Sequence, residues 1–305
     1  MRVVLAVALS IAANAWAQPC RPPACTDGAI ADDGVSILNR VGRVKAPFAT
    51  ADLPRVESEF TAARMLVATG HYRIAERWSV GLRIPTAPSS VRQPSGSYVA
   101  ENIFGNIELF AEHQLELWRR GRMRLRPALR VGLAAPTAGL GSVSEVTENR
   151  GLAISNALDG WRLPELYEPG VVPVTFSARI DGELDQVRVL ARAKLPWLVR
   201  ISDGGYPDDA VTRPLGIVPI FELAASYWPW SWMGVGAGSF LVINAPAPVA
   251  PGSGSDRAGR VQLGVEPSLR LVIANHVMLE ADLALPVGGP LEDTLGIGLT
   301  ISAYR

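Results

Sequence analysis

The chain has 305 residues, and its 29 Lys and Arg side chains balance its 29 Asp and Glu side chains, so no net charge attracts it to nucleic acid. Hydrophobic residues make up 48% of the chain, yet beyond the N-terminus no apolar run reaches the about 18 residues of a transmembrane helix. Period-two alternation recurs along the chain while helical periodicity is scarce, which predicts an all-β fold.

The first 17 residues have the pattern of a secretory signal peptide. Arg2 supplies the positive charge, residues 3–13 form the apolar core, and Ala15-Trp16-Ala17 provides the small residues of a cleavage site before Gln18. An N-terminal apolar strand or anchor helix is the alternative interpretation. The pattern predicts that the mature chain begins outside the cytoplasm.

Residues 18–34 are rich in Pro, Asp and Ala and predict an irregular periplasmic arm. Cys20 and Cys25, the two cysteines of the chain, both lie in this arm. In an oxidising compartment they are spaced to close a small disulfide loop. A metal site would need more ligands than this stretch offers, so no metal is predicted here.

Residues 35–305 predict one antiparallel transmembrane β-barrel of about 12 strands. A weak first strand is expected at 35–44 and a last strand at 295–304, with five hairpins between them. The hairpins pair 60–74 with 78–84, 106–117 with 123–133, 172–180 with 187–195, 217–228 with 232–243, and 261–273 with 277–285.

The connections between the expected strands alternate between tight turns and long loops. The long loops are 85–102, 136–170, 196–214, 245–259 and 286–294. In outer-membrane barrels the periplasmic turns are short and the extracellular loops are long. This alternation therefore favours an outer-membrane barrel.

The aromatic residues fall into two bands, as expected for rings that prefer the headgroup level of a bilayer. Those near the short turns are Trp78, Trp118, Trp228, Trp230 and Trp232, with Tyr72, Tyr227 and Tyr304. Those near the long loops are Phe60, Tyr98, Phe104, Trp161, Tyr167, Trp197, Tyr206 and Phe240.

Alternation alone does not reveal which face of a strand is buried. Within residues 106–133, one strand carries a row of glutamates and the next a row of arginines. A soluble barrel would put its apolar row inside, whereas a membrane barrel turns it toward lipid and puts the polar row in the lumen. The loop pattern, the aromatic bands and the matched charges favour the second arrangement.

The polar rows are therefore predicted to line the lumen and to set the selectivity of passage. Their members are Glu108, Glu112, Glu116, Arg124, Arg126, Arg130, Arg188, Arg192, Lys194, Glu222, Glu266, Arg270, Glu280 and Asp282. Three prolines, Pro127, Pro219 and Pro267, lack a ladder donor and are expected at rims or bulges. His113 falls on the lipid-facing row, which suits only the interfacial zone near a short turn.

The phrase GNIELFAEHQLEL (105–117) followed by RPALRVGLAAPTAG (126–139) resembles outer-membrane transporters of the phenol-degradation meta-pathway type. Proteins of that type carry a Gly-started alternating strand and then a strand ending in Leu-x-x-Pro-Thr-Gly, where Ala138 here displaces the glycine. The resemblance implies an outer-membrane barrel, passive passage of a hydrophobic or aromatic solute, and no catalytic residue.

No enzyme, cofactor or metal site is predicted. The histidines His71, His113 and His276 fall at the short-turn end, whereas outer-membrane barrel enzymes resemble one another in using a His near the outer rim. The acidic stretch 203–210 is a candidate for binding calcium or bridging lipopolysaccharide, but its spacing matches no defined calcium loop, which favours a hydrated loop.

The sequence thus predicts a channel for a small solute in the outer membrane of a Gram-negative bacterium, in contact with lipid and lipopolysaccharide. Barrels of about 8 strands are filled by side chains and those of about 16 to 18 leave a channel, so about 12 predicts a lumen constricted by its charges or by the 18–34 arm. One alternative is a non-conducting surface protein whose 136–170 loop, with Trp161 and Tyr167, binds a partner. Another is a secreted soluble β-barrel or sandwich with an apolar interior.

Overall fold

The computed structural model describes residues 34–45, 59–92, 98–138, 162–168, 170–202, 214–243, 261–273, 277–289 and 294–304. The predicted signal peptide, the arm up to residue 33 with Cys20 and Cys25, and Trp161 lie outside the described residues. The acidic stretch 203–210 and His276 also lie outside them.

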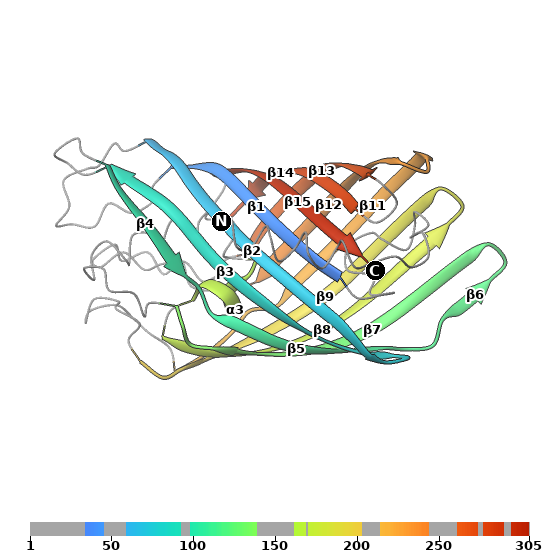
Figure 1. Ribbon diagram of the computed structural model, residues 1–305, viewed down its shortest axis with the longest axis horizontal. Helices are drawn as coiled ribbons and strands as arrows, with labels where there is room; N and C mark the ends of the chain where they lie inside the picture. The colour runs from blue at the N-terminus through green and yellow to red at the C-terminus, as the bar shows by residue number, and fades with distance from the viewer. Residues whose placement is uncertain are drawn as a thin grey trace.

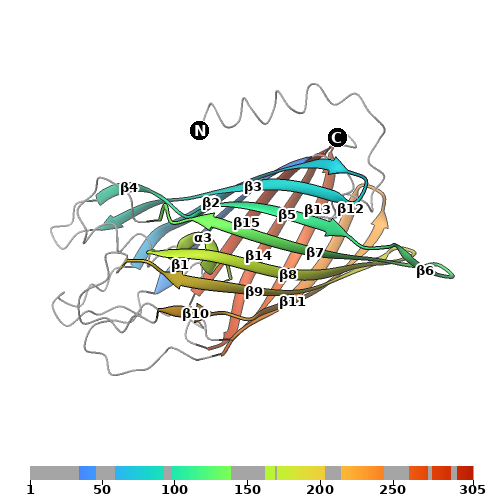
Figure 2. The same ribbon diagram turned by 90° about the horizontal axis from the view of Figure 1, so that it is seen from below.

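The described residues form an antiparallel barrel, closed where β15 pairs with β1 along their whole length (Figures 1 and 2). The strands are β1 (Gly34–Lys45), β2 (Glu59–Ala75), β3 (Trp78–Arg92), β4 (Tyr98–Phe104), β5 (Ile107–Gln114), β6 (Trp118–Arg120), β7 (Met123–Ala135), β8 (Val171–Leu184), β9 (Val187–Arg200), β10 (Leu215–Ile217), β11 (Ile220–Trp230), β12 (Met233–Ile243), β13 (Val261–Ile273), β14 (Val277–Gly288) and β15 (Thr294–Tyr304).

These strands make twelve traverses of the wall, because two traverses are interrupted. β4 and β5 pair in turn with β3, and β5 and β6 pair in turn with β7. β10 and β11 likewise both pair with β9. The predicted all-β barrel of about twelve strands is confirmed, and its first strand is β1.

The wall extends further toward the long-loop end than the sequence predicted. The expected loop 85–102 is largely strand, since β3 continues to Arg92 and pairs with β4. β3 contains two prolines, Pro85 and Pro88, which lack a ladder donor. Pro85 is tolerated beside the β4–β5 break, where its carbonyl accepts the Gly105 N–H at 3.0 Å.

The three prolines expected at rims or bulges do lie where the hydrogen-bonded ladder is interrupted. Pro127 is the residue next to the end of the β5–β7 ladder, opposite the break between β5 and β6. Pro219 lies between β10 and β11. Pro267 pairs with β12 but falls in a gap of the β13–β14 ladder.

The outer face of the barrel carries the large apolar side chains. Leu109 is 64% exposed and Leu223 is 60% exposed, while Glu108 and Glu222 beside them in sequence turn inward. A soluble barrel would bury the leucines, so the exposed outer face contradicts the alternative of a soluble barrel with an apolar interior. A face of this kind matches lipid, as in membrane barrels.

Among the side chains that the structure describes, the aromatic band at the short-turn end is present except at Trp228. Trp78, Trp118, Trp230 and Trp232 are exposed on the outside, and Trp230 stacks on Trp232 with ring centroids 5.8 Å apart. Trp228 is instead buried and points inward, because it lies on the even-numbered face of β11. There its indole N–H donates to Ser226 Oγ at 3.1 Å.

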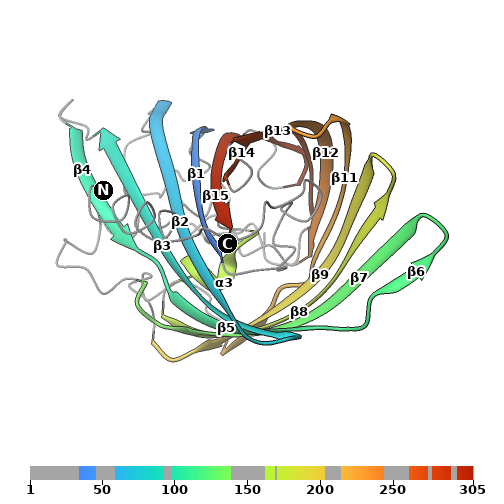
Figure 3. The same ribbon diagram turned by 45° about the vertical axis from the view of Figure 1, so that its right-hand side comes forward.

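One short helix, α3 (Pro164–Tyr167), occurs among the described residues. Figure 3 shows it inside the ring of strands. No helix in the described ranges is long and apolar enough to cross a membrane.

Candidate functional site: a lumen crossed by residues 162–168

The inner faces of the strands surround a cavity of about 340 Å³. Nine of the predicted lumen residues line it: Glu112, Arg130, Arg192, Lys194, Glu222, Glu266, Arg270, Glu280 and Asp282. Hydroxyl side chains of six strands also line it: Ser36, Thr69, Thr175, Ser177, Ser239, Ser268, Thr300 and Ser302.

The other predicted residues lie elsewhere. Glu108 is fully buried in the wall, and Arg188 is buried with its guanidinium 5.2 Å from the Trp228 ring centroid. Arg126 is half-buried toward the short turns.

Glu116 and Arg124 do not line the lumen, which corrects the prediction for both. Glu116 falls in the β5–β6 break, where its side chain is 83% exposed and pairs with Arg77 at 3.4 Å. Arg124 is exposed one residue beyond the start of β7, next to the short turn. Alternation predicts the face of a strand, but not where the enclosed part of the barrel ends.

Residues 162–168, the described end of the long loop 136–170, run through the lumen rather than over the surface. Leu166 and Tyr167 are fully buried. Their packing partners come from strands around the ring: Leu38, Met65, Val67, Leu198, Val218, Ile220, Phe240 and Val242. This inward segment constricts the lumen, a role that the sequence assigned to the charge rows or to the arm.

Three charged residues fasten the inward segment 162–168 to the wall. Arg162 Nη1 lies 2.7 Å from Glu266 Oε2 on β13, and Glu168 Oε1 lies 3.0 Å from Arg200 Nη2 on β9. Between them, Glu165 Oε1 lies 3.0 Å from Lys194 Nζ. Losing one partner of a buried pair of this kind costs about 3–5 kcal/mol.

Glu165 also joins the segment to a second wall. Its Oε1 lies 2.9 Å from Arg83 Nη2 on β3. Arg83 pairs in turn with Glu108, whose Oε2 lies 2.8 Å from Arg130 Nη2 on β7. A continuous row of alternating charges therefore runs from β9 through the inward segment to β3, β5 and β7.

The remaining inward charges pair within the wall. Glu112 Oε1 lies 2.8 Å from Arg179 Nη2 on β8, although Arg130 is its ladder neighbour. Arg192 pairs with Glu222 at 3.0 Å, and Arg270 pairs with Glu280 at 2.8 Å. The predicted matching of opposite charges across the wall is present. Arg192–Glu222 and Arg270–Glu280 are ladder partners, whereas Glu112 pairs with Arg179 in place of its ladder neighbour.

Asn106 anchors both ends of the 136–170 loop. Its side chain is fully buried. Its Oδ1 accepts the Ala138 N–H at 3.0 Å, and its Nδ2 donates to the Glu168 carbonyl at 2.8 Å. Its backbone N–H donates to the Leu166 carbonyl at 2.6 Å.

Gly105 and Thr137 complete the anchor. Thr137 Oγ1 donates to the Gly105 carbonyl at 2.6 Å and accepts the Ile107 N–H at 3.1 Å. A side chain on Gly105 would meet the Leu166 carbonyl, so the position needs glycine. The two sequence phrases that carried the family resemblance thus meet at the point where the inward segment is held.

Sequence reasoning missed six charged residues of this site: Arg83, Arg162, Glu165, Glu168, Arg179 and Arg200. Alternation along β3 and β8 could have identified Arg83 and Arg179. Nothing in the sequence distinguishes Arg162 and Glu165 from ordinary loop charges.

The two histidines in the described part of the chain, His71 and His113, are separate from each other. His71 lines the cavity, and His113 lies against Trp78 with ring centroids 4.5 Å apart on the lipid-facing side. No group of three or more His, Cys, Asp or Glu side chains in the described ranges could hold a metal ion.

No protein-family model matches this sequence, and no curated protein matches it. The structure is similar to the COG4313 outer membrane channel from Pseudomonas putida F1, with a TM-score of 0.58, 13% sequence identity, and coverage of 90% of this chain and 96% of that chain. Two further structures are less similar. The NanC porin has a TM-score of 0.47 and 6% sequence identity, with coverage of 89% of this chain and 99% of that chain. The KdgM porin has a TM-score of 0.46 and 7% sequence identity, with coverage of 88% of this chain and 99% of that chain.

The similarity to the COG4313 channel shows a shared fold. The predicted outer-membrane β-barrel is therefore confirmed as a fold, and the apolar outer face agrees with a barrel surrounded by lipid.

Proposed function

We propose that the protein is an outer-membrane channel of a Gram-negative bacterium through which a small solute crosses passively. The observation that carries this proposal is a closed twelve-traverse barrel around a cavity of about 340 Å³ lined by charged and hydroxyl side chains. Twelve strands lie between the filled barrels of about 8 and the open channels of about 16 to 18.

The lining bears on the kind of solute. The family resemblance implied a hydrophobic or aromatic one. The cavity instead presents arginine, lysine, carboxylate and hydroxyl groups beside apolar side chains, among them Leu38, Val67, Leu163, Met278, Phe110 and Phe240. The charged part of this surface favours a solute with polar groups, because a wholly hydrophobic one would remove water from the charges without replacing it.

A second candidate function is a non-conducting surface protein, and the inward segment 162–168 favours it by crossing the lumen. Tyr167 does not serve this candidate in the way the sequence suggested, because it is fully buried. Recognition of a partner would rest on loop residues outside the described ranges. Neither candidate is an enzyme.

Conductance separates the two candidates. The full chain, purified in detergent and reconstituted into a planar lipid bilayer, is expected to give discrete current steps. A chain that fractionates with outer membranes yet gives no current would support the surface protein. A chain recovered from the soluble periplasm would contradict both candidates.

A further inference from the structure

We propose that the cavity selects small zwitterions, solutes with an anionic group at one end and an ammonium group at the other. This inference rests on the proposed channel function and names its substrate class. It follows from which member of each ion pair faces the cavity, and from the placement of those members on opposite walls.

On the wall formed by β7, β8 and β9, the cation is the more exposed partner. The Arg130 side chain is 21% exposed while its partner Glu108 is fully buried. Arg192 is 32% exposed against 18% for Glu222. In the Arg179–Glu112 and Lys194–Glu165 pairs the cation is again the more exposed of the two side chains. This wall therefore presents guanidinium and ammonium groups to the lumen.

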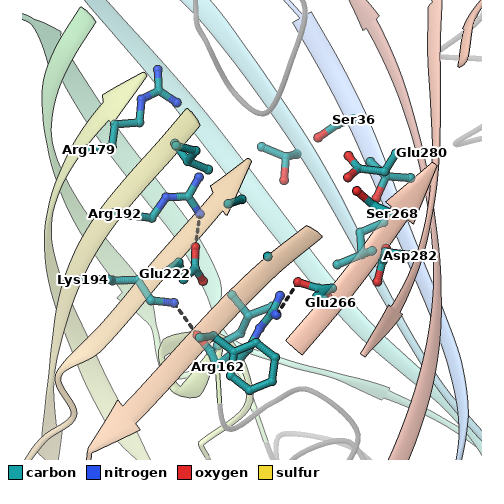
Figure 4. A pocket seen from close by; sticks show the side chains of 18 of the residues that line it. Ser36, Arg162, Arg179, Arg192, Lys194, Glu222, Glu266, Ser268, Glu280 and Asp282 are labelled. Carbon is teal, nitrogen blue, oxygen red and sulfur yellow. Dashed lines mark hydrogen bonds and ion pairs between the residues drawn. The ribbon is translucent and has the colours of Figure 1, made fainter. Parts of the chain in front are cut away.

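On the opposite wall the order is reversed by a smaller margin. Glu266 is 19% exposed against 14% for Arg162, and Glu280 is slightly more exposed than Arg270. Asp282 lines the cavity beside them. The neighbouring hydroxyls belong to Ser36, Ser268, Thr300 and Ser302. Figure 4 shows the two sets facing each other, with Arg179, Arg192 and Lys194 on one side and Ser36, Ser268, Glu280 and Asp282 on the other.

Two walls of opposite sign act differently on different solutes. A cavity with low-dielectric walls focuses the field of its charges. A solute with one charge is attracted by one wall and repelled by the other, whereas a zwitterion can satisfy both at once. A volume of about 340 Å³ is at the lower end of ligand pockets, which suits a solute the size of an amino acid.

The test measures how probes block the ion current of the reconstituted full chain. The zwitterion 4-aminobutyrate is compared with neutral 4-hydroxybutyramide, anionic butyrate and cationic butylamine, which share its chain length. Half-block by the zwitterion is expected at a concentration about tenfold lower than for the other three, the factor that one charge-assisted hydrogen bond supplies.

Paired variants locate the effect without changing net charge. R192Q/E222Q removes the exposed guanidinium of one wall together with its partner. R270Q/E280Q removes the Glu280 carboxylate, which lines the cavity on the other wall, together with Arg270. Each is expected to raise the half-blocking concentration of 4-aminobutyrate about tenfold, by loss of one charge-assisted bond. The reversal potential in a salt gradient should shift toward cations in the first variant and toward anions in the second. The control R77Q/E116Q, an exposed pair outside the cavity, should change neither.

Equal block by zwitterion and neutral probe, or by zwitterion and butyrate, would overturn the proposal while leaving the channel intact. Shifts of the same sign in both wall variants would also overturn it. Complete silence of the wild type would instead contradict the channel function. In that case calorimetry with 4-aminobutyrate on the detergent-solubilised chain decides, and heat of binding that R192Q/E222Q abolishes would still support the zwitterion site.

Discussion

Asn106 is one side chain that fastens two backbone segments inside the barrel. It accepts from Ala138 and donates to Glu168, so its loss leaves two buried backbone groups without partners. Asn106→Ala is expected to lower the free energy of unfolding by about 1–3 kcal/mol. Urea unfolding of the chain in lipid vesicles measures the change.

Two comparisons make this prediction specific. Gln186→Ala, in the exposed β8–β9 turn, should change stability by less than about 0.5 kcal/mol. Asn106→Asp keeps the acceptor for Ala138 but loses the donor to Glu168, so an intermediate value is expected. An Asn106→Ala variant as stable as the wild type would show that the anchor contributes nothing.

Glu165 holds the inward segment through two cations on different walls. Glu165→Gln removes the charge that pairs with Arg83 and Lys194 while keeping the size of the side chain. Because losing a buried partner costs about 3–5 kcal/mol, the docked position of the segment should weaken. Single-channel recording is expected to show a ratio of open to closed time at least about tenfold larger than in the wild type. A tenfold change in this ratio requires only about 1.4 kcal/mol.

The matched control for Glu165→Gln is Glu116→Gln, since Glu116 forms an exposed ion pair outside the lumen. Its open time should equal that of the wild type. If Glu165→Gln also leaves the current unchanged while the barrel remains folded, the segment does not limit passage.

At the scale of strands, a glycine on one strand accommodates an aromatic ring on its neighbour. Gly264 of β13 pairs with Phe240 of β12, and a Cβ at Gly264 would collide with the Phe240 ring. That ring packs in the same buried cluster as the inward segment, with the Arg162 guanidinium 4.8 Å from its centroid. Gly264→Ala is expected to destabilise the chain by about 1–3 kcal/mol through overpacking.

Gly70→Ala on β2 is the matched substitution, because no atom lies within 4 Å of the added Cβ. It should change unfolding in urea by less than about 0.5 kcal/mol. Equal effects at the two positions would mean that the ring of Phe240 moves aside without cost.

For the molecule as a whole, lipid on the outside makes the cost of a charge depend on depth. Val131 lies in the middle of β7 and Leu184 ends β8 at a short turn, and both are exposed. Val131→Arg is expected to cost about 2–4 kcal/mol and Leu184→Arg about 0–1 kcal/mol in vesicles. Urea titration of both variants measures the difference.

If the outer face were in water, neither arginine would lower the free energy of unfolding much. A difference between the two variants is therefore evidence that lipid surrounds the barrel. An equal loss in the free energy of unfolding at both positions would contradict the placement of Val131 near the middle of the bilayer and Leu184 near its edge. A chain that needs no detergent to stay in solution would contradict it as well.

The sequence by itself determined the barrel, its number of traverses and the face of most inward charges. These properties are local: side chains alternate with period two, short turns follow from a few residues, and a lipid-facing row is apolar throughout. Alternation placed Arg192, Glu222 and Glu280 correctly for this reason. It failed at Glu116, since a break in β5–β6 depends on neighbouring strands.

Only the tertiary structure decided which charges pair outside the strand ladders and what constricts the lumen. Glu165 and Arg162 belong to a loop without periodicity, and their partners lie on strands far away in sequence. The pairing follows from the close approach of Leu166 to Gly105 and Asn106, which no sequence interval encodes. Long-range contacts of this kind select among arrangements that local patterns leave equally allowed, and here they place a loop inside the barrel.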